Sequence, residues 1–196
     1  MGHNIFTRGD FDKYKVVSIN EAMTDVDILH HGLTNGKISV FISHKHDDLE
    51  ELKGIIGFLE TKYNIKAYID SRDDSMPLRT SGETASRIKE RIIQCEKFIL
   101  LTTDAAIESK WCNWELGFGD AQKFSLNSIA LFPIKERCAG DKDFKGYEYM
   151  EIYPHIVYRK NDTYSSGKRI PDGYYVRYKE NDRFFLKKLE DWLNSH

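Results

Sequence analysis

Short apolar runs alternate with segments of helical periodicity from Lys37 onward, and this alternation constrains the fold more than any other feature of the chain. Runs rich in β-branched residues are typical of buried strands, whereas apolar residues spaced by three and four indicate one face of a helix. The pattern predicts strands at residues 38–43, 66–70, 97–103, 128–134 and 155–159. Strands that alternate with helices in this way predict a parallel sheet covered by helices on both faces.

The segments between these strands have helix signals of their own. Apolar residues recur at helical spacing through residues 49–59 and again through 85–95. Residues 71–82 are polar and contain Pro77, so we expect a long loop there. Ser109 is a suitable N-cap for a further helix. After the last parallel strand we expect an edge strand at 174–178 and a closing helix with Phe185, Leu189 and Trp192 on one face.

Polar residues follow the ends of the first three predicted strands. In open parallel sheets, ligands bind outside the carboxyl ends of the strands. Ser43 ends the first strand, and His44 and Lys45 follow it. Asp70 and Arg72 lie at and after the end of the second strand, and the segment after residue 103 follows the third. These segments are therefore expected to meet at one crevice.

The helix after that third segment carries Trp111 and Glu115. Residues four positions apart share a helix face, so the ring and the carboxylate should lie one above the other. An aromatic ring beside a lone acid suits a flat, cationic or sugar-bearing ligand. Glu115 read alone also fits a solvated helix acid, and Trp111 fits either the core or the wall of a site. We expect Trp114 and Phe118 in the core.

Composition excludes several classes of function. The net charge of −2 and the lack of a basic block argue against nucleic acid or anionic membrane as partner. No run approaches the ~20 apolar residues that a membrane span requires. Three cysteines without a C-x-x-C pair fit a reducing cytoplasm. His44-x-His46 followed by Asp47 and Asp48 hints at a metal, but polar residues after a strand produce such groups by chance, so no metal is predicted.

Three segments in register resemble the boxes of the TIR (Toll/interleukin-1 receptor) domain family. Residues 40–48 (VFISHKHDD) resemble its first box, and residues 68–82 resemble its second strand and BB loop. Residues 109–116 (SKWCNWEL) resemble the box of plant and bacterial members. The resemblance covers residues 37–160 and implies a flavodoxin-like, three-layer α/β fold around a central parallel five-stranded sheet. Residues 1–36 are then an N-terminal extension, and residues 161–196 an edge segment and closing helix packed on the domain.

The resemblance also implies an activity. Many bacterial and plant TIR domains cleave NAD+ at the nicotinamide–ribose bond and release nicotinamide with linear or cyclic ADP-ribose. A stand-alone bacterial chain of this kind resembles the NAD-consuming component of anti-phage systems such as Thoeris. Such a chain needs no cofactor beyond NAD+ as substrate. It would be cytoplasmic, associate with itself through TIR–TIR contacts and serve a downstream effector that senses the product.

The same resemblance assigns the site residues. Glu115 takes the place of the catalytic acid, and Trp111 lines the site. The NAD+-binding residues are expected to be Ser43, His44, Lys45, Asp70, Arg72, Gly82 and Thr84. The BB loop is longer than its family pattern, so the alignment of Arg72 and Arg79 with the pyrophosphate stays open, and Pro77 is a candidate for self-association. Two alternatives remain: a non-enzymatic scaffold that signals by TIR–TIR assembly, and a regulator that holds NAD+ without cleaving it.

Overall fold

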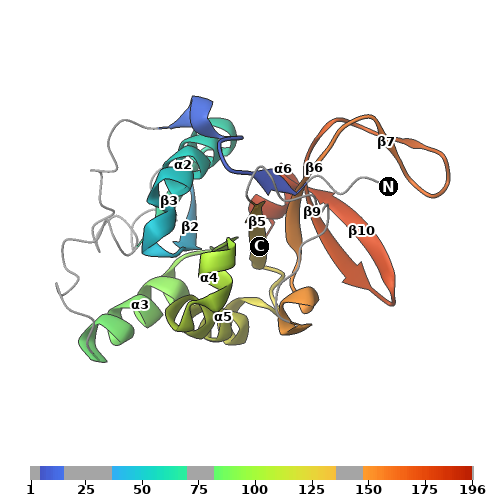
Figure 1. The fold of residues 1–196 in the computed structure, drawn as a ribbon. Coiled ribbons are helices and arrows are strands. Elements are labelled where there is room, and N and C mark those ends of the chain that lie inside the picture. Colours follow the sequence, from blue (N-terminus) through green and yellow to red (C-terminus); the bar gives the residue numbers. More distant parts are fainter. Residues whose placement is uncertain (1–4, 16–36, 70–81, 136–147, 196) are drawn as a thin grey trace.

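The computed structural model describes residues 5–15, 37–69, 82–135 and 148–195 (Figure 1). Its main sheet has the strand order β3-β2-β4-β5-β6-β9-β10. The strands from β3 to β6 in this order are parallel, β9 is antiparallel to β6, and β10 is antiparallel to β9. The parallel strands are β2 (Ile38–Ser43), β3 (Ile65–Tyr68), β4 (Lys97–Thr102), β5 (Ile129–Lys135) and β6 (His155–Arg159). This order is the flavodoxin-like arrangement. The predicted parallel five-stranded sheet is therefore confirmed, with an antiparallel extension at one edge.

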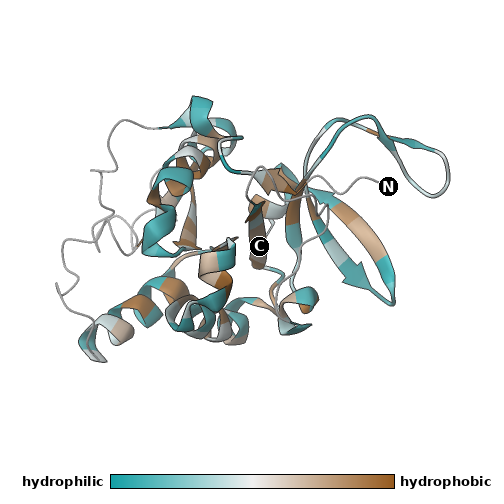
Figure 2. Cartoon of the chain, viewed as in Figure 1, coloured by the Kyte–Doolittle hydropathy of each residue, from teal (hydrophilic) through white to brown (hydrophobic). Residues whose placement is uncertain are grey.

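Helices cover both faces of this sheet. On one face lie α2 (Leu49–Tyr63) and α6 (Leu189–Leu193), and on the other lie α3 (Gly82–Gln94), α4 (Asp104–Glu108) and α5 (Lys110–Lys123). Side chains of successive strand residues point to opposite faces, so each strand contributes to two separate clusters. Val40 and Ile42 belong to the α2 cluster, whereas Phe41 belongs to the α3/α5 cluster. Figure 2 shows hydrophobic residues concentrated along the inner strands and hydrophilic ones on the outer helix surfaces.

A row of aromatic rings fixes the register of three strands on the α3/α5 face. Phe41 of β2 is paired with Tyr68 of β3 on one side and with Phe98 of β4 on the other. Its ring stacks on both, with centroid separations of 5.5 and 5.6 Å. Ser43 lies two residues beyond Phe41, so its side chain points to this same face.

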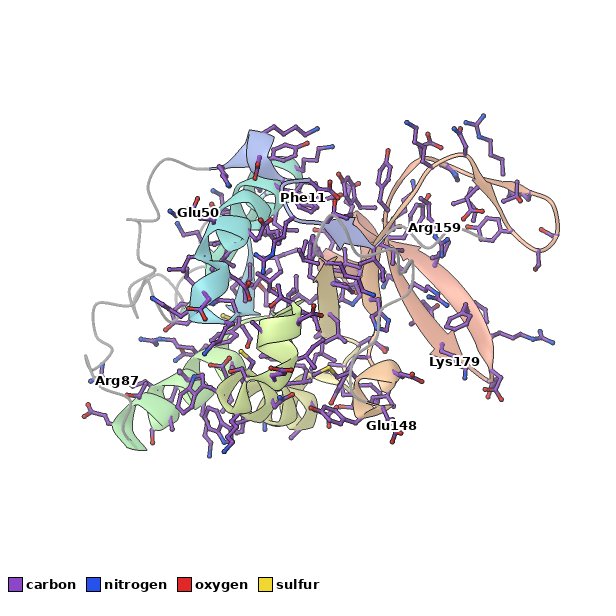
Figure 3. The ribbon with its side chains drawn as sticks, in the orientation of Figure 1. Phe11, Glu50, Arg87, Glu148, Arg159 and Lys179 are labelled. Atoms are coloured by element: carbon purple, nitrogen blue, oxygen red, sulfur yellow. The ribbon has the colours of Figure 1, made fainter. Side chains whose placement is uncertain are left out.

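Residues 5–15 pack on the α2 face. The strand β1 (Phe6–Thr7) pairs in parallel with the end of β5, and η1 (Asp12–Tyr14) contacts α2. Phe11 is buried, with its ring 4.9 Å from that of Phe58 and 5.4 Å from that of Phe132 (Figure 3). This close approach requires a glycine at position 54, because a Cβ there would lie 2.8 Å from the carbonyl oxygen of Phe11. The division of the chain at residues 36 and 160 stays a prediction.

The C-terminal region differs from the prediction in two respects. Residues 174–178 lie inside β9 (Gly173–Glu180), which is not an edge strand because β10 (Arg183–Lys188) pairs with its outer side. The turn between them has Asn181 and Asp182 at φ 48° and 57°, the left-handed pair of a tight hairpin. Phe185 therefore belongs to a strand and is exposed, whereas α6 begins at residue 189 and buries its apolar side chains.

The remaining elements are short. They are η2 (His46–Asp48), η4 (Glu148–Ile152) and a two-stranded ribbon of β7 (Asp162–Thr163) and β8 (Arg169–Ile170). Gly82, predicted to end a loop, is the first residue of α3, while residues 71–81 of that loop lie outside the described part. Among the described residues, the helices are too short or too polar to cross a membrane.

Candidate active site

The strand order reverses between β2 and β4, since the chain passes from β2 to one side of the sheet and from β4 to the other. In open α/β sheets this switch point, at the carboxyl ends of the strands, is where ligands bind. Ser43 is the last residue of β2, and Thr103 directly follows β4. The polar residues predicted to meet at one rim therefore flank the position that the topology favours for a ligand.

Two consecutive helices place Glu115 at this rim. Thr103 caps α4 by accepting a hydrogen bond from the backbone N–H of Ala106 at 3.1 Å. Ser109 caps α5, as predicted, by accepting one from the backbone N–H of Cys112 at 3.3 Å. The two caps fix where α5 begins, and Glu115 follows in its second turn.

The side chain of Glu115 is 2% exposed, although it carries a carboxylate. The hydroxyl of Ser43, which is also buried, donates a hydrogen bond to its Oε2. Burying a carboxylate is costly unless hydrogen-bond donors satisfy it, so the serine stabilises the acid in this position. The solvated-acid interpretation of Glu115 is therefore wrong for this structure.

The two tryptophans of α5 pack against each other on the same helix as this carboxylate. Trp111, one turn before Glu115, is half-buried and its ring lies 4.9 Å from that of Trp114. Trp114 and Phe118, expected in the core, are only half-buried and pack against its edge. Lys89 of α3 covers both of these rings, at 5.8 and 5.2 Å from their centroids. They therefore join α5 to α3. Trp111 is half-buried against the same α3/α5 cluster, and its role as a site wall stays a prediction.

The other predicted site residues divide into two groups. His44 is buried, with Nδ1 3.4 Å from the carbonyl oxygen of Ile42, and Lys45 beside it is half-buried. Gly82 and the buried Thr84 form the first turn of α3, which packs on α5. Asp70 and Arg72 lie outside the described residues, as do Pro77 and Arg79. The structure thus brings Ser43 and Glu115 into direct contact and places the described others on adjoining segments.

The histidines and acids after β2 do not form a metal site among the described residues. His46 and Asp47 are exposed, whereas Asp48 is buried. Asp48 instead accepts hydrogen bonds from Arg8 Nη2 at 2.8 Å and from the hydroxyl of Thr103 at 2.5 Å.

This Arg8–Asp48–Thr103 network was not predicted from the sequence. From the sequence, Asp48 was considered only as part of the metal-like group that follows the first strand. In the structure its carboxylate ties the amino-terminal segment to the loop that leads into α4, and the backbone N–H of Gly9 adds a 3.1 Å bond to Glu51. No sequence signal joins Arg8 to an acid 40 positions away, because the pairing depends on how β1 docks against β5.

Comparison with known proteins agrees with this geometry. The sequence model of the TIR domain family matches residues 40–164, which is more than half of the chain. A protein of Bacillus cereus named as a probable 3′ cyclic ADP-D-ribose synthase is 27% identical over 165 residues, covering 78% of this chain and 83% of its own. A candidate cyclic ADP-D-ribose synthase of Cytobacillus dafuensis is 32% identical over 118 residues, 56% of this chain. That match spans 31% of the longer Cytobacillus protein.

Proposed function

The chain belongs to the TIR domain family, and from that premise we propose that it is an NAD+-consuming enzyme. In this proposal it breaks the nicotinamide–ribose bond and releases nicotinamide together with a cyclic ADP-ribose. The buried Glu115 carboxylate, held by Ser43 at the switch point of the sheet, is the observation that carries the proposal. The names of the two relatives, both cyclic ADP-D-ribose synthases, support the class of reaction.

Cleavage of the nicotinamide–ribose bond requires little from the protein besides a negative charge fixed beside the ribose. When the bond between ribose C1′ and the nicotinamide nitrogen breaks, its electron pair passes to the nitrogen, and nicotinamide leaves as a neutral molecule without a general acid. Positive charge develops on the ribose, as it does in glycoside hydrolysis. A carboxylate fixed beside the ring stabilises that charge and needs no reorganisation during the reaction.

Four of the predicted site residues have a role in this proposal. Glu115 accepts hydrogen bonds from the ribose hydroxyls and stabilises the cation, while Ser43 holds the carboxylate in place. The exposed part of Trp111 offers its ring face to the pyridinium by stacking and cation–π attraction. Lys45 is a candidate contact for the pyrophosphate.

The fate of the ribose cation decides the product. If water attacks C1′, a proton is released and the product is linear ADP-ribose. If an oxygen or nitrogen of the same ADP-ribose attacks, the attacking group releases a proton and the product is a cyclic form, lighter than linear ADP-ribose by one water. Because both relatives are named for cyclic products, we expect cyclisation to dominate.

The test is chromatography with mass detection of NAD+ incubated with wild-type protein and with Glu115→Gln. We expect nicotinamide release to fall at least ~100-fold in the variant, the scale of losing a central electrostatic contact in a transition state. Glu108→Gln changes an exposed acid of the preceding helix and serves as the matched control. Full activity of a folded Glu115→Gln protein would disprove the assignment.

Ser43→Ala tests the positioning of the carboxylate separately. It leaves the acid in place but removes its donor, so we expect a loss of roughly 10-fold, smaller than that of Glu115→Gln. Equal losses in the two variants would contradict a positioning role and indicate that the serine contacts NAD+ directly.

Self-association through TIR–TIR contacts, a downstream effector that senses the product, a cytoplasmic location and a role in anti-phage defence all stay predictions. The scaffold alternative differs from the enzyme at one point: it requires assembly that Glu115→Gln does not alter and no release of nicotinamide under any condition.

A further inference from the structure

A second polar pocket lies on the face of the sheet opposite the Ser43–Glu115 pair. It has a volume of about 440 Å³ and is formed by η1, the end of α2, the start of β9 and α6. Its tyrosines other than Tyr175 pack against the α2 core cluster, whereas the neighbours of Glu115 on α5 pack into the α3/α5 cluster. The sheet therefore separates the two sites.

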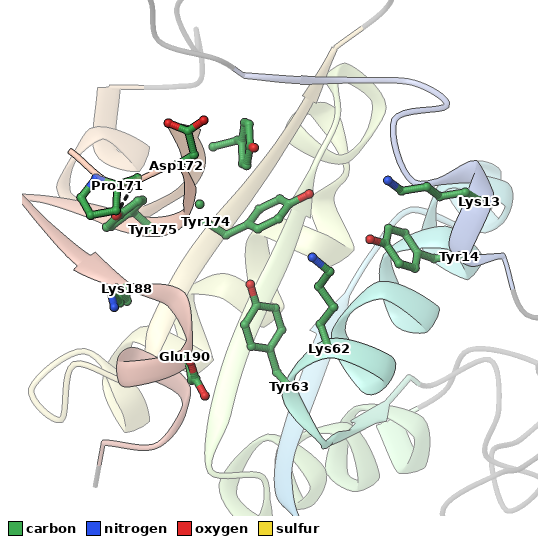
Figure 4. A pocket seen from close by; sticks show the side chains of 12 residues that line it. Lys13, Tyr14, Lys62, Tyr63, Pro171, Asp172, Tyr174, Tyr175, Lys188 and Glu190 are labelled. Carbon is green, nitrogen blue, oxygen red and sulfur yellow. Dashed lines mark hydrogen bonds between the residues drawn. The ribbon is translucent and has the colours of Figure 1, made fainter. Parts of the chain in front are cut away.

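Tyrosine hydroxyls form the floor of this pocket. The ring of Tyr174 packs 4.6 Å from that of Phe58 and 4.9 Å from that of Tyr158, which leaves its hydroxyl at the pocket end. In Figure 4 the hydroxyl of Tyr63 and the ammonium group of Lys62 point toward Tyr174, whose own hydroxyl points to the side of Lys13 and Tyr14. Within the described part of the chain, neither hydroxyl has a hydrogen-bond partner.

The protonation of these tyrosines makes them donors. Burial raises the pKa of Tyr174 to about 12, with the neighbouring Tyr14 and Tyr158 adding to the effect, and it also raises that of Tyr63. Both hydroxyls are therefore neutral at physiological pH and can donate to an acceptor in the pocket.

Lysines supply the charge. Lys62 lies 5.6 Å from the ring centroid of Tyr174, and Lys13 lies 5.1 Å from that of Tyr14. Lys188 is the third lysine that lines the pocket. Among the described residues none of these three lysines has a carboxylate partner. Two acids also line the pocket: Asp172, which directly precedes β9, and Glu190 of α6 (Figure 4).

We propose that this pocket binds a nucleotide, with its phosphates at Lys62, Lys13 and the tyrosine hydroxyls. Lysines and neutral hydroxyls together present donors and positive charge, which is the chemistry that recognises phosphate oxygens. The carboxylate of Glu190 faces the other end, where it can accept from ribose hydroxyls or an exocyclic amine. A volume of about 440 Å³ falls in the range of small-molecule sites and exceeds what a lone phosphate fills.

The test is isothermal titration of the full chain with ADP as probe and adenosine as the phosphate-free control. We expect saturable binding of ADP and binding of adenosine weaker by at least ~10-fold, since the phosphates supply the charged contacts. Lys62→Gln should weaken ADP binding ~10-fold or more, and Tyr174→Phe, which keeps the ring and removes the hydroxyl, by a smaller factor. Lys53→Gln, on the same helix but away from the pocket, should leave it unchanged.

The active site is the main competing location, and one further variant separates the two. Loss of ADP binding in Glu115→Gln, with binding unchanged in Lys62→Gln and Tyr174→Phe, would place the ADP in the active site and overturn the proposal. No saturable binding up to millimolar ADP would overturn the proposal. ADP affinity that is unchanged in both Lys62→Gln and Tyr174→Phe would also overturn it, because ADP would then bind elsewhere. Neither result depends on whether the protein consumes NAD+.

Discussion

Replacing Gly54 with alanine reverses the usual sign of a glycine-to-alanine change in a helix. Gly54 lies in the interior of α2, where alanine is normally favoured by about 1 kcal/mol. Here the new Cβ would lie 2.8 Å from the Phe11 carbonyl oxygen, 3.0 Å from its Cβ and 3.1 Å from its carbonyl carbon. Two of these three atoms are backbone, so a rotamer change cannot relieve the overlap.

The expected loss of stability follows from two opposing terms. Forcing a methyl group into a packed contact costs about 1–3 kcal/mol. The gain in helix propensity offsets up to about 1 kcal/mol of that cost. With the full gain subtracted, we expect Gly54→Ala to lower the free energy of unfolding by up to about 2 kcal/mol, which corresponds to a fall in Tm of up to roughly 8 °C for a chain of this size.

The assay is thermal unfolding of the wild type, Gly54→Ala and Gly117→Ala, followed by circular dichroism. Gly117 lies in α5, where a new Cβ would meet no neighbouring side chain or packed element within 4 Å, so alanine there should stabilise the protein. Faster hydrogen exchange in residues 5–15 of Gly54→Ala should accompany the lower Tm, because the overlap pushes Phe11 away. A Gly54→Ala protein as stable as Gly117→Ala would refute the argument that α2 and the amino-terminal segment touch backbone to backbone.

Three further outcomes are expected. Burial, with the charge of Lys187 adding to it, lowers the pKa of Lys97 from 10.5 to about 8, so the folded state binds fewer protons between these values. Stability should therefore rise from pH 8 to 10, and Lys97→Met should flatten that rise in denaturant titrations. Arg8→Gln leaves the buried Asp48 carboxylate without its charged partner and should cost about 1–3 kcal/mol in the same titrations. Ser109→Ala removes the α5 N-cap and should cost about 1 kcal/mol, measured as a lower Tm.

Local signals accounted for most of the central sheet. The strand at 155–159 matches β6 at both ends, because a short apolar run between charged segments leaves few alternative boundaries. The cap at Ser109 was equally accessible, since hydroxyl residues before a helix satisfy its free N–H groups. Such features depend on neighbours in the chain, and neighbours are visible in a single sequence.

The closing helix shows how periodicity misleads at a boundary. Phe185, Leu189 and Trp192 are spaced by four and three, but the first belongs to β10 and the others to α6. The signal that identifies the hairpin was present in Asn181-Asp182, a pair that favours the left-handed conformation of two-residue turns.

The sequence predicted where the candidate site lies in the fold, but not the contact within it. The rule for parallel sheets put Ser43 and Glu115 at one rim, whereas the hydrogen bond between them depends on the height at which α5 crosses the sheet. The pocket behind the sheet had no signal of this kind. Its tyrosines come from η1, α2, β6 and β9, and only the packed structure brings them together.

The pairing of β1 with β5 has a consequence for how the protein is made on the ribosome. Phe6 and Thr7 leave the ribosome well before their partners in β5, Ile134 and Lys135. Until those residues emerge, Phe6 and Phe11 have no sheet to dock on and remain exposed to solvent or to chaperones. Domains generally fold as units during synthesis. Residues 6–7 can therefore take their place in the sheet only after β5 has been synthesised.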